Sequence, residues 1–292
     1  MIREPFLKQV WHFILHLRLH YQFFILSGGY LLSALFVEEN NWQQFWTQFL
    51  NVHVLLFGGA TAYNSFWDKD EGPIGGLKSP PKMTNWMWLV SLAIQFIGLA
   101  WAYTIGLSYF LIYLCSLILF WLYSTPLARW KGKPLLSLIA IGISTGTNSF
   151  LLGYLAGGEP KLTFSEGAIA FGVACIILSL YPASQIFQVE EDRKRGDITF
   201  AMKYGLKIVR IFYSIMFLIG ASILSLFLYF EDSILGLIFG VLSLFSFSGI
   251  AFILSKLEGK ESEYGKVMKI KFLASLSFVL FILSTLLIKS II

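Results

Sequence analysis

Two polar stretches of the sequence have residue types and a spacing suited to binding a divalent cation. The first comprises Asn64, Asp68 and Glu71, and the second comprises Gln185, Gln188 and Asp192. Within each set the intervals are three or four residues, so a continuous helix would place its members on one face. Carboxylate and amide oxygens suit Mg²⁺, which usually binds through one or two carboxylates plus substrate phosphates. We therefore predict that the two faces converge on Mg²⁺.

A basic segment lies between the two acidic faces in the sequence. It begins at Tyr123 and carries Arg129 and Lys131, and Lys78 and Arg193 add further positive charge nearby. Basic side chains and hydroxyls of this kind can clamp a phosphate. With an apolar bundle beneath, the set suits a ligand with an anionic head and a long apolar tail. The simpler alternative is that these charges are solvated and only determine topology.

A histidine stripe is a weaker candidate for a metal site. His12, His16 and His20 recur every four residues and would share one helical face, but no cysteine or acid accompanies them to complete a zinc site. A polar stripe at the membrane interface, or packing, explains them more simply. Cys115 and Cys175 lie within apolar runs and are interpreted as small buried hydrophobic residues.

The composition determines which elements can position these residues. Hydrophobic residues make up 57% of the 292 residues and charged residues only 13%, whereas about a quarter of a soluble domain is charged. Apolar runs of roughly 20 residues predict membrane-spanning helices, because backbone groups in lipid must bond within their own segment. The predicted spans are 19–37, 47–66, 86–103, 107–124, 135–156, 166–187, 209–230, 234–255 and 268–288. We expect an all-α membrane protein of about nine spans, with residues 1–292 forming one domain.

The basic residues predict the orientation of this bundle. Under the nine-helix topology 20 of the 22 lysines and arginines fall on one side, and only Lys161 and Lys289 fall on the other. The positive-inside rule then places the N-terminus and the candidate site loops in the cytoplasm and the C-terminus opposite. The net charge of +5 is thus a topology signal, and we expect no nucleic-acid partner. No cleavable signal or transit peptide is indicated, which favours a bacterial plasma membrane.

At the acidic faces and the basic segment, the chain resembles the UbiA superfamily of intramembrane prenyltransferases. Asn64 and Asp68 match its first motif, Asn-Asp-x-x-Asp-x-x-x-Asp, while Ser65 and Gly72 replace the other two acids. The second motif is matched at Glu190, Asp192 and Gly196, and Gln188 stands where the family usually has Asp. Residues 123–131 are similar to the family's Tyr-Ser-x-Pro-Pro-x-Arg-x-Lys. The three motifs occur in order, and the resemblance spans nearly the whole chain.

The resemblance implies a UbiA-like bundle that transfers a prenyl chain from a prenyl diphosphate to a lipophilic acceptor, using Mg²⁺. The implied metal ligands are Asn64, Asp68, Glu71, Glu190 and Asp192. The implied diphosphate-binding residues are Lys78, Arg129, Lys131 and Arg193. The implied catalytic residues are Asp68, Asp192, Lys131 and Tyr123. Asp70 and Glu71 would compensate for the two acids missing from the first motif.

Two alternatives follow from the same resemblance. One is a membrane terpene cyclase, in which the carbocation is quenched within the same molecule. The other is a non-catalytic protein that binds or transports prenyl lipids, because a protein without catalysis would tolerate the substituted motif positions.

Overall fold

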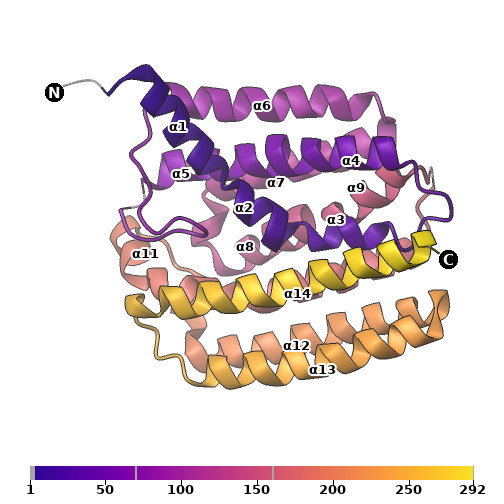
Figure 1. The fold of residues 1–292 in the computed structure, drawn as a ribbon. Helices are drawn as coiled ribbons and strands as arrows, with labels where there is room; N and C mark the ends of the chain where they lie inside the picture. The colour runs from indigo at the N-terminus through magenta and orange to yellow at the C-terminus, as the bar shows by residue number, and fades with distance from the viewer. Residues whose placement is uncertain (1–3, 70, 160, 292) are drawn as a thin grey trace.

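The computed structural model describes residues 4–69, 71–159 and 161–291, and within them the regular secondary structure is helical. Apart from helices, these residues contain one isolated β-bridge, between Ile74 and Leu77. The long helices lie side by side, α1 begins at the left of Figure 1, and α14 ends at the right. This arrangement confirms the predicted all-α class.

The helices are of very different lengths. The longer ones are α1 (Phe6–Leu17), α4 (Trp42–Leu50), α5 (Gly59–Asp68), α6 (Trp86–Tyr103), α7 (Leu107–Ser124), α8 (Pro134–Ile141), α9 (Asn148–Gly157), α10 (Phe164–Leu180), α12 (Phe200–Glu231), α13 (Ser233–Ser255) and α14 (Tyr264–Ile291). The shorter ones are α2 (Leu19–Tyr21), α3 (Gly28–Ser33), α11 (Val189–Arg195), the π-helical η1 (Gln22–Leu26), η2 (Asn51–Gly58) and η4 (Gly142–Thr147), and the 3₁₀ turns η3 (Trp130–Gly132), η5 (Pro182–Gln188) and η6 (Glu261–Glu263).

Seven helical stretches among the described residues are long and apolar enough to cross a membrane. They are Trp86–Tyr103, Leu107–Ser124, Pro134–Gly157, Phe164–Arg195, Phe200–Glu231, Ser233–Ser255 and Glu261–Ser290. The predicted spans 86–103 and 107–124 coincide with α6 and α7. The predicted spans 19–37 and 47–66 are largely helical but are not among the seven, so the count of nine is not confirmed. The first helical stretch ends at Ser33, and the second carries buried polar residues such as Asn51 and His53.

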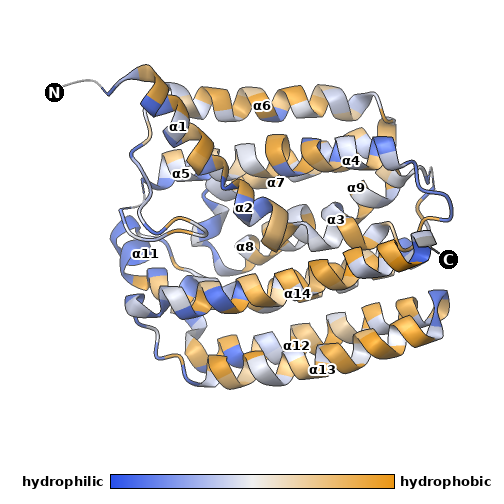
Figure 2. Cartoon of the chain, viewed as in Figure 1, coloured by the Kyte–Doolittle hydropathy of each residue, from blue (hydrophilic) through white to orange (hydrophobic). Residues whose placement is uncertain are grey.

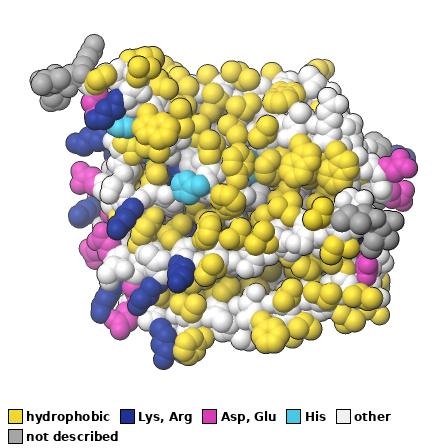
Figure 3. Space-filling model, viewed as in Figure 1, with side chains coloured by type: hydrophobic (Ala, Val, Ile, Leu, Met, Phe, Trp, Pro, Cys, Tyr) yellow, Lys and Arg dark blue, Asp and Glu magenta, His cyan; other side chains and the backbone are white. Residues whose placement is uncertain are grey.

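The surface separates into an apolar belt and a charged end. Large hydrophobic side chains are exposed along the helices, for example Phe245 with 74% of its surface accessible, as expected for groups that face lipid. Lysine, arginine and acidic side chains gather where the loops after α5, α7, α11 and α13 meet, at the left of Figures 2 and 3. We call this the charged end. The division supports an integral membrane protein.

A buried polar network joins three helices inside the belt. The Asn51 side chain donates to the Gly98 carbonyl at 3.1 Å, and the Tyr113 hydroxyl donates to Asn51 Oδ1 at 3.1 Å. A Cβ at position 98 would overlap the Tyr113 hydroxyl, so only glycine permits this approach of α6 to α7. The network satisfies polar groups that would be costly in lipid.

Two local signals turn the chain at the charged end. Pro182 lacks a backbone N–H, and there α10 gives way to the 3₁₀ turn η5 and then to α11. Gly196, with φ of 77°, ends α11 in a left-handed turn in which the Asp197 N–H donates to the Asp192 carbonyl at 2.9 Å. Asp197 is thereby folded back toward the bundle.

Candidate active site

A cavity of about 520 Å³ begins at the charged end and extends among the helices. Its polar lining includes Asn64, Asp68, Lys131, Asp192, Arg195 and Asp197. Its apolar lining includes Phe57, Phe120, Val173, Phe239, Phe278 and Phe281. The volume is typical of ligand sites, which run roughly 300–1,000 Å³. A charged mouth above an apolar interior fits an amphiphilic ligand.

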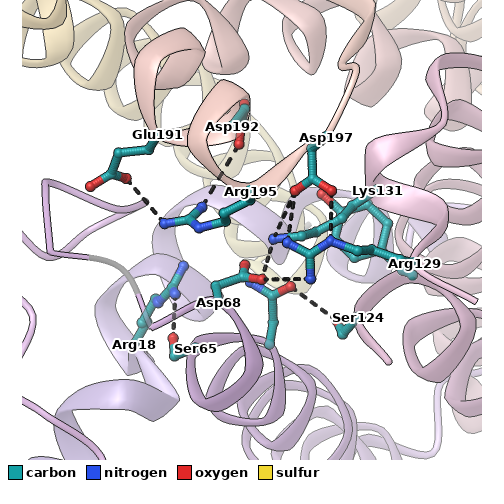
Figure 4. Close-up of polar contacts among 12 residues, drawn as sticks. Arg18, Ser65, Asp68, Ser124, Arg129, Lys131, Glu191, Asp192, Arg195 and Asp197 are labelled. Atoms are coloured by element: carbon teal, nitrogen blue, oxygen red, sulfur yellow. Dashed lines mark hydrogen bonds and ion pairs between the residues drawn. The ribbon is translucent and has the colours of Figure 1, made fainter. Parts of the chain in front are cut away.

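Asp68 is the last residue of α5 and the centre of the polar mouth. Its carboxylate accepts a hydrogen bond from the Lys131 ammonium at Oδ1 and one from the Asn64 amide at Oδ2, the latter at 2.8 Å. Ser124 donates to Asn64 Oδ1 at 3.0 Å and fixes the orientation of that amide. Asn64 and Asp68 thus share one helical face, and the Asp68 side chain is only 5% exposed. Figure 4 shows the surrounding contacts.

Arg129 and Asp197 form a second ion pair beside Asp68 (Figure 4). The Arg129 Nε and Nη2 atoms donate to the two Asp197 carboxylate oxygens at 2.6 and 2.8 Å. Lys131 Nζ is 3.8 Å from Asp197, and Arg129 Nη1 is 4.0 Å from Asp68. Burial alone would lower the pKa of Arg129, but the bonds to Asp197 outweigh it and raise that pKa above its ordinary value. Asp197 is therefore shared between two cations.

Asp192 faces the cavity from α11, where Arg195 Nη1 lies 3.8 Å from its carboxylate. Arg195 also donates to Glu191 Oε2 at 3.4 Å, and Glu191 Oε1 accepts the Gly72 N–H at 2.6 Å. Glu191 thus ties the loop after α5 to α11. This tie links the segments that carry Asp68 and Asp192, which are far apart in the sequence.

Other predicted residues also line the cavity. The Tyr123 hydroxyl lies 3.0 Å from the Tyr181 hydroxyl, and both rings reach the cavity. Gln185 and Gln188 line it too, and each is bonded to backbone: Gln185 accepts from the Ala201 N–H, and Gln188 donates to the Pro73 carbonyl.

Several predicted residues are not brought into this cluster. Glu190 and Arg193 bond each other at 2.9 Å with 69% and 64% of their side chains exposed, because Asp192 takes the inward face of α11. Glu71 and Lys78 are exposed and do not line the cavity. Helix α5 ends at Asp68, since Lys69 adopts a left-handed φ of 51°, so Glu71 is not on the Asn64–Asp68 face. Asp70 lies outside the described residues.

Four charged residues that line the cavity have no role in the sequence-based prediction. They are Arg18, Arg195, Asp197 and Lys271. Arg18 is buried and donates to Ser65 Oγ at 2.6 Å, and Lys271 donates to the Tyr21 hydroxyl at 2.8 Å. The turn at Gly196, directly before Asp197, is a sequence signal that could have placed Asp197 at the site. Arg18 and Lys271 make contacts across long stretches of sequence that no local pattern indicates.

The histidine stripe contacts a loop. His16 Nε2 lies 2.8 Å from the Pro81 carbonyl, and His20 Nε2 lies 2.8 Å from the Gly76 carbonyl. Burial lowers the pKa of His16 to about 4, so this ring is neutral at pH 7. Two histidines of the stripe therefore position the loop that follows α5, and the Gly75 part of this loop lines the cavity.

The oxygen ligands at the mouth fit Mg²⁺ bound together with a substrate. In the described part of the chain, no three His, Cys, Asp or Glu side chains form a ready metal cluster. Asp68, Asp192 and the Asn64 amide nevertheless line one cavity. Two carboxylates and an amide would leave coordination positions for phosphate oxygens and water, as Mg²⁺ requires.

Comparison with known families gives a match that covers most of the chain. The model of the UbiA prenyltransferase family matches residues 23–276. No curated protein matches this sequence.

Solved structures share the fold at low sequence identity. A UbiA homologue from Archaeoglobus fulgidus bound to GPP and Mg²⁺ has 17% identity and a TM-score of 0.69, with 92% of this chain and 99% of that chain covered. A UbiA homologue from Archaeoglobus fulgidus bound to DMAPP and Mg²⁺ has 18% identity and a TM-score of 0.68, with 91% of this chain and 98% of that chain covered. A digeranylgeranylglyceryl phosphate synthase has 20% identity and a TM-score of 0.62, with 94% and 98% covered.

Proposed function

The chain belongs to the UbiA prenyltransferase family, and from that premise we propose that it is a Mg²⁺-dependent prenyltransferase. It would transfer a prenyl chain from a prenyl diphosphate to a lipophilic acceptor within the membrane. The observation that carries the proposal is the cavity, in which Asp68, Asp192 and Lys131 stand at the mouth of an apolar interior. The similar Archaeoglobus fulgidus structures with Mg²⁺ and GPP or DMAPP support it.

Each residue at the mouth has a role in this proposal. Asp68, Asp192 and the Asn64 amide would hold Mg²⁺, which when bound supplies positive charge against the leaving diphosphate. Lys131 and Arg195 line the same space and would bind diphosphate oxygens. Arg129 does not line the cavity, so it would act by holding Asp197 beside Lys131.

The transfer itself needs a dry, aromatic environment. The bond between C1 of the prenyl chain and the diphosphate oxygen breaks, and the electron pair leaves with the diphosphate. C1 then bonds to a nucleophilic atom of the acceptor, which loses its proton. Rings at the cavity wall, including Phe57, Phe120 and Tyr123, would shield the developing allylic cation from water and stabilise it by cation–π contact.

The location of the site follows from the same proposal. The charged end would face the cytoplasm, as the positive-inside rule predicts, so a soluble prenyl diphosphate could reach the mouth while the acceptor stays in the bilayer. The membrane would be a bacterial plasma membrane, and residues 1–292 would form one domain.

Ligand-induced thermal stabilisation tests the donor site. With Mg²⁺ present, a prenyl diphosphate at 100 times its Kd should stabilise the purified protein by about 2.7 kcal/mol. The effect should require Mg²⁺ and should disappear in the Asp68→Asn/Asp192→Asn double variant. Chains of several lengths are compared. A folded wild-type protein that no chain length stabilises would contradict the proposal, and product formed without any acceptor would indicate a cyclase.

The exposed pair on α11 provides a contrasting prediction. Glu190→Gln and Arg193→Gln should each change Mg²⁺-dependent donor affinity by less than about twofold, because exposed ion pairs contribute little. The same stabilisation assay measures this. If Glu190→Gln loses as much Mg²⁺-dependent donor affinity as Asp192→Asn does, Glu190 is instead a metal ligand.

A further inference from the structure

Lys271 of α14 is a cavity-lining cation that has no carboxylate partner among the described residues. Its ammonium donates to the Tyr21 hydroxyl at 2.8 Å and lies 5.3 Å from the centre of the Tyr21 ring. The three acids that line the cavity are already engaged: Asp68 with Lys131, Asp192 with Arg195, and Asp197 with Arg129. Lys271 is therefore a positive charge in excess of the acids around it.

An ammonium in this position favours an anionic ligand. Lys271 is half-buried, and removing a charge from water is costly unless an opposite charge or good hydrogen bonds compensate. The Tyr21 hydroxyl and ring compensate in part and fix the ammonium in place. Two of the three ammonium donors remain available to a ligand in the cavity.

The face of α14 beyond Lys271 also lines the cavity. Ser275 and Phe278 follow at i+4 and i+7 and share its helical face. Ser243 and Ser246 of α13 line the same cavity. Helix α14 packs mainly on η1 and α3, and α13 packs on α12. The Phe239 ring of α13 meets the Phe278 and Phe281 rings of α14 at 6.0 and 5.5 Å between centroids, and all three rings line the cavity. An apolar chain in this part of the cavity would lie against these rings.

We infer that Lys271, held by Tyr21, binds an anionic headgroup of the acceptor, whose tail lies along the Ser275 and Phe278 face of α14. The inference rests on the proposed function and names the acceptor class: a lipid with a phosphate or carboxylate head. The donor's diphosphate has its own cations, because Arg195 lies on α11 with Asp192 and Lys131 bonds Asp68. Lys271 comes from a different helix, α14, on which Ser275 and Phe278 also line the cavity.

A binding experiment with three matched amphiphiles tests the inference. The probes are a long-chain alkylglycerol, its phosphate ester and an analogue of the same tail with a carboxylate head. Each is titrated against purified wild-type protein, with and without Mg²⁺ and a non-hydrolysable prenyl thiolodiphosphate. We expect an anionic probe to bind at least about tenfold tighter than the neutral one, as a charge-assisted contact predicts. The better of the two anionic probes identifies the head.

Variants assign that preference to one side chain. Lys271→Gln should remove it and leave thiolodiphosphate affinity within about twofold, while Lys271→Arg should keep most of it. Lys269→Gln is the matched control, since Lys269 is exposed two residues away and does not line the cavity. Tyr21→Phe should weaken anionic binding by a smaller factor, because it removes only the hydroxyl that holds the ammonium.

Two results would overturn the inference. One is equal binding of charged and neutral probes by the wild-type protein, which needs no variant to fold. The other is a Lys271→Gln variant that loses thiolodiphosphate affinity instead, which would place Lys271 in the donor site. If the wild-type protein binds no thiolodiphosphate but still prefers anionic probes through Lys271, the proposed function fails while the anion site stands.

Discussion

Asp68→Asn is expected to slow Mg²⁺-dependent release of diphosphate from a prenyl diphosphate by at least about 100-fold, equivalent to about 2.7 kcal/mol of transition-state stabilisation. The substitution keeps the shape of the side chain but removes the negative charge that a metal ligand needs. Native membrane vesicles, which supply the acceptor, are a suitable assay. Purified variant protein should also lose donor-induced thermal stabilisation.

The Asp68→Asn variant should remain folded. An asparagine oxygen can still accept from Lys131, whose charge keeps Asp197 at 3.8 Å as a partner, while the hydrogen bond from the Asn64 amide at 2.8 Å is lost. One such bond contributes about 1 kcal/mol. Asp232→Asn is a matched control for the same chemical change, because Asp232 caps α13 far along the chain and asparagine is also a good cap. Near wild-type turnover in folded Asp68→Asn would remove Asp68 from the metal site.

The spans were predictable from sequence where apolar runs are continuous and long. The predicted bounds of α6 and α7 match because each is a single apolar run. The first two predicted spans were harder because buried polar residues, such as Asn51, lower the apolar content while packing satisfies them internally. Composition alone cannot distinguish a polar residue paired inside the bundle from one in a loop.

The site was predictable only within single helical turns. Helical spacing correctly placed Asn64 beside Asp68, and the structure brings Lys131 to the same carboxylate. Spacing failed at Glu71 because α5 ends at Asp68, where Lys69 adopts a left-handed conformation. A pattern of residue types does not reveal this helix end.

Long-range contacts account for the residues that the sequence did not indicate. Arg18 bonds Ser65 from 47 residues away, and Lys271 bonds Tyr21 from 250 residues away. Periodicity reports the face of one helix and says nothing about which helix that face meets. Such pairs emerge only once the bundle is assembled.

Asp197→Ala is expected to weaken Mg²⁺-dependent donor binding by about tenfold, or about 1.4 kcal/mol. The buried Asp197 carboxylate, 2% exposed, holds Arg129 by two hydrogen bonds and stands 3.8 Å from Lys131. Without it, both cations turn to Asp68, which Arg129 already approaches at 4.0 Å. A carboxylate engaged by two cations binds Mg²⁺ less readily, since the ion must displace them. A Mg²⁺ titration of donor-induced stabilisation measures the change.

Arg129→Gln should not weaken Mg²⁺-dependent donor binding as Asp197→Ala does. A general loss of packing would instead weaken binding in both variants. With Arg129 removed, Asp197 is free to attract Lys131 away from Asp68. The Mg²⁺ concentration needed for donor-induced stabilisation should therefore stay the same or fall. The Arg129→Gln/Asp197→Ala double variant should then recover most of the affinity that Asp197→Ala loses, a coupling that two independent effects would not produce. Thermal stability without ligand is followed in each variant, because a buried charge left unpaired lowers it separately. If the effects of the two single variants on donor affinity simply add in the double variant, Asp197 does not act by keeping cations off Asp68.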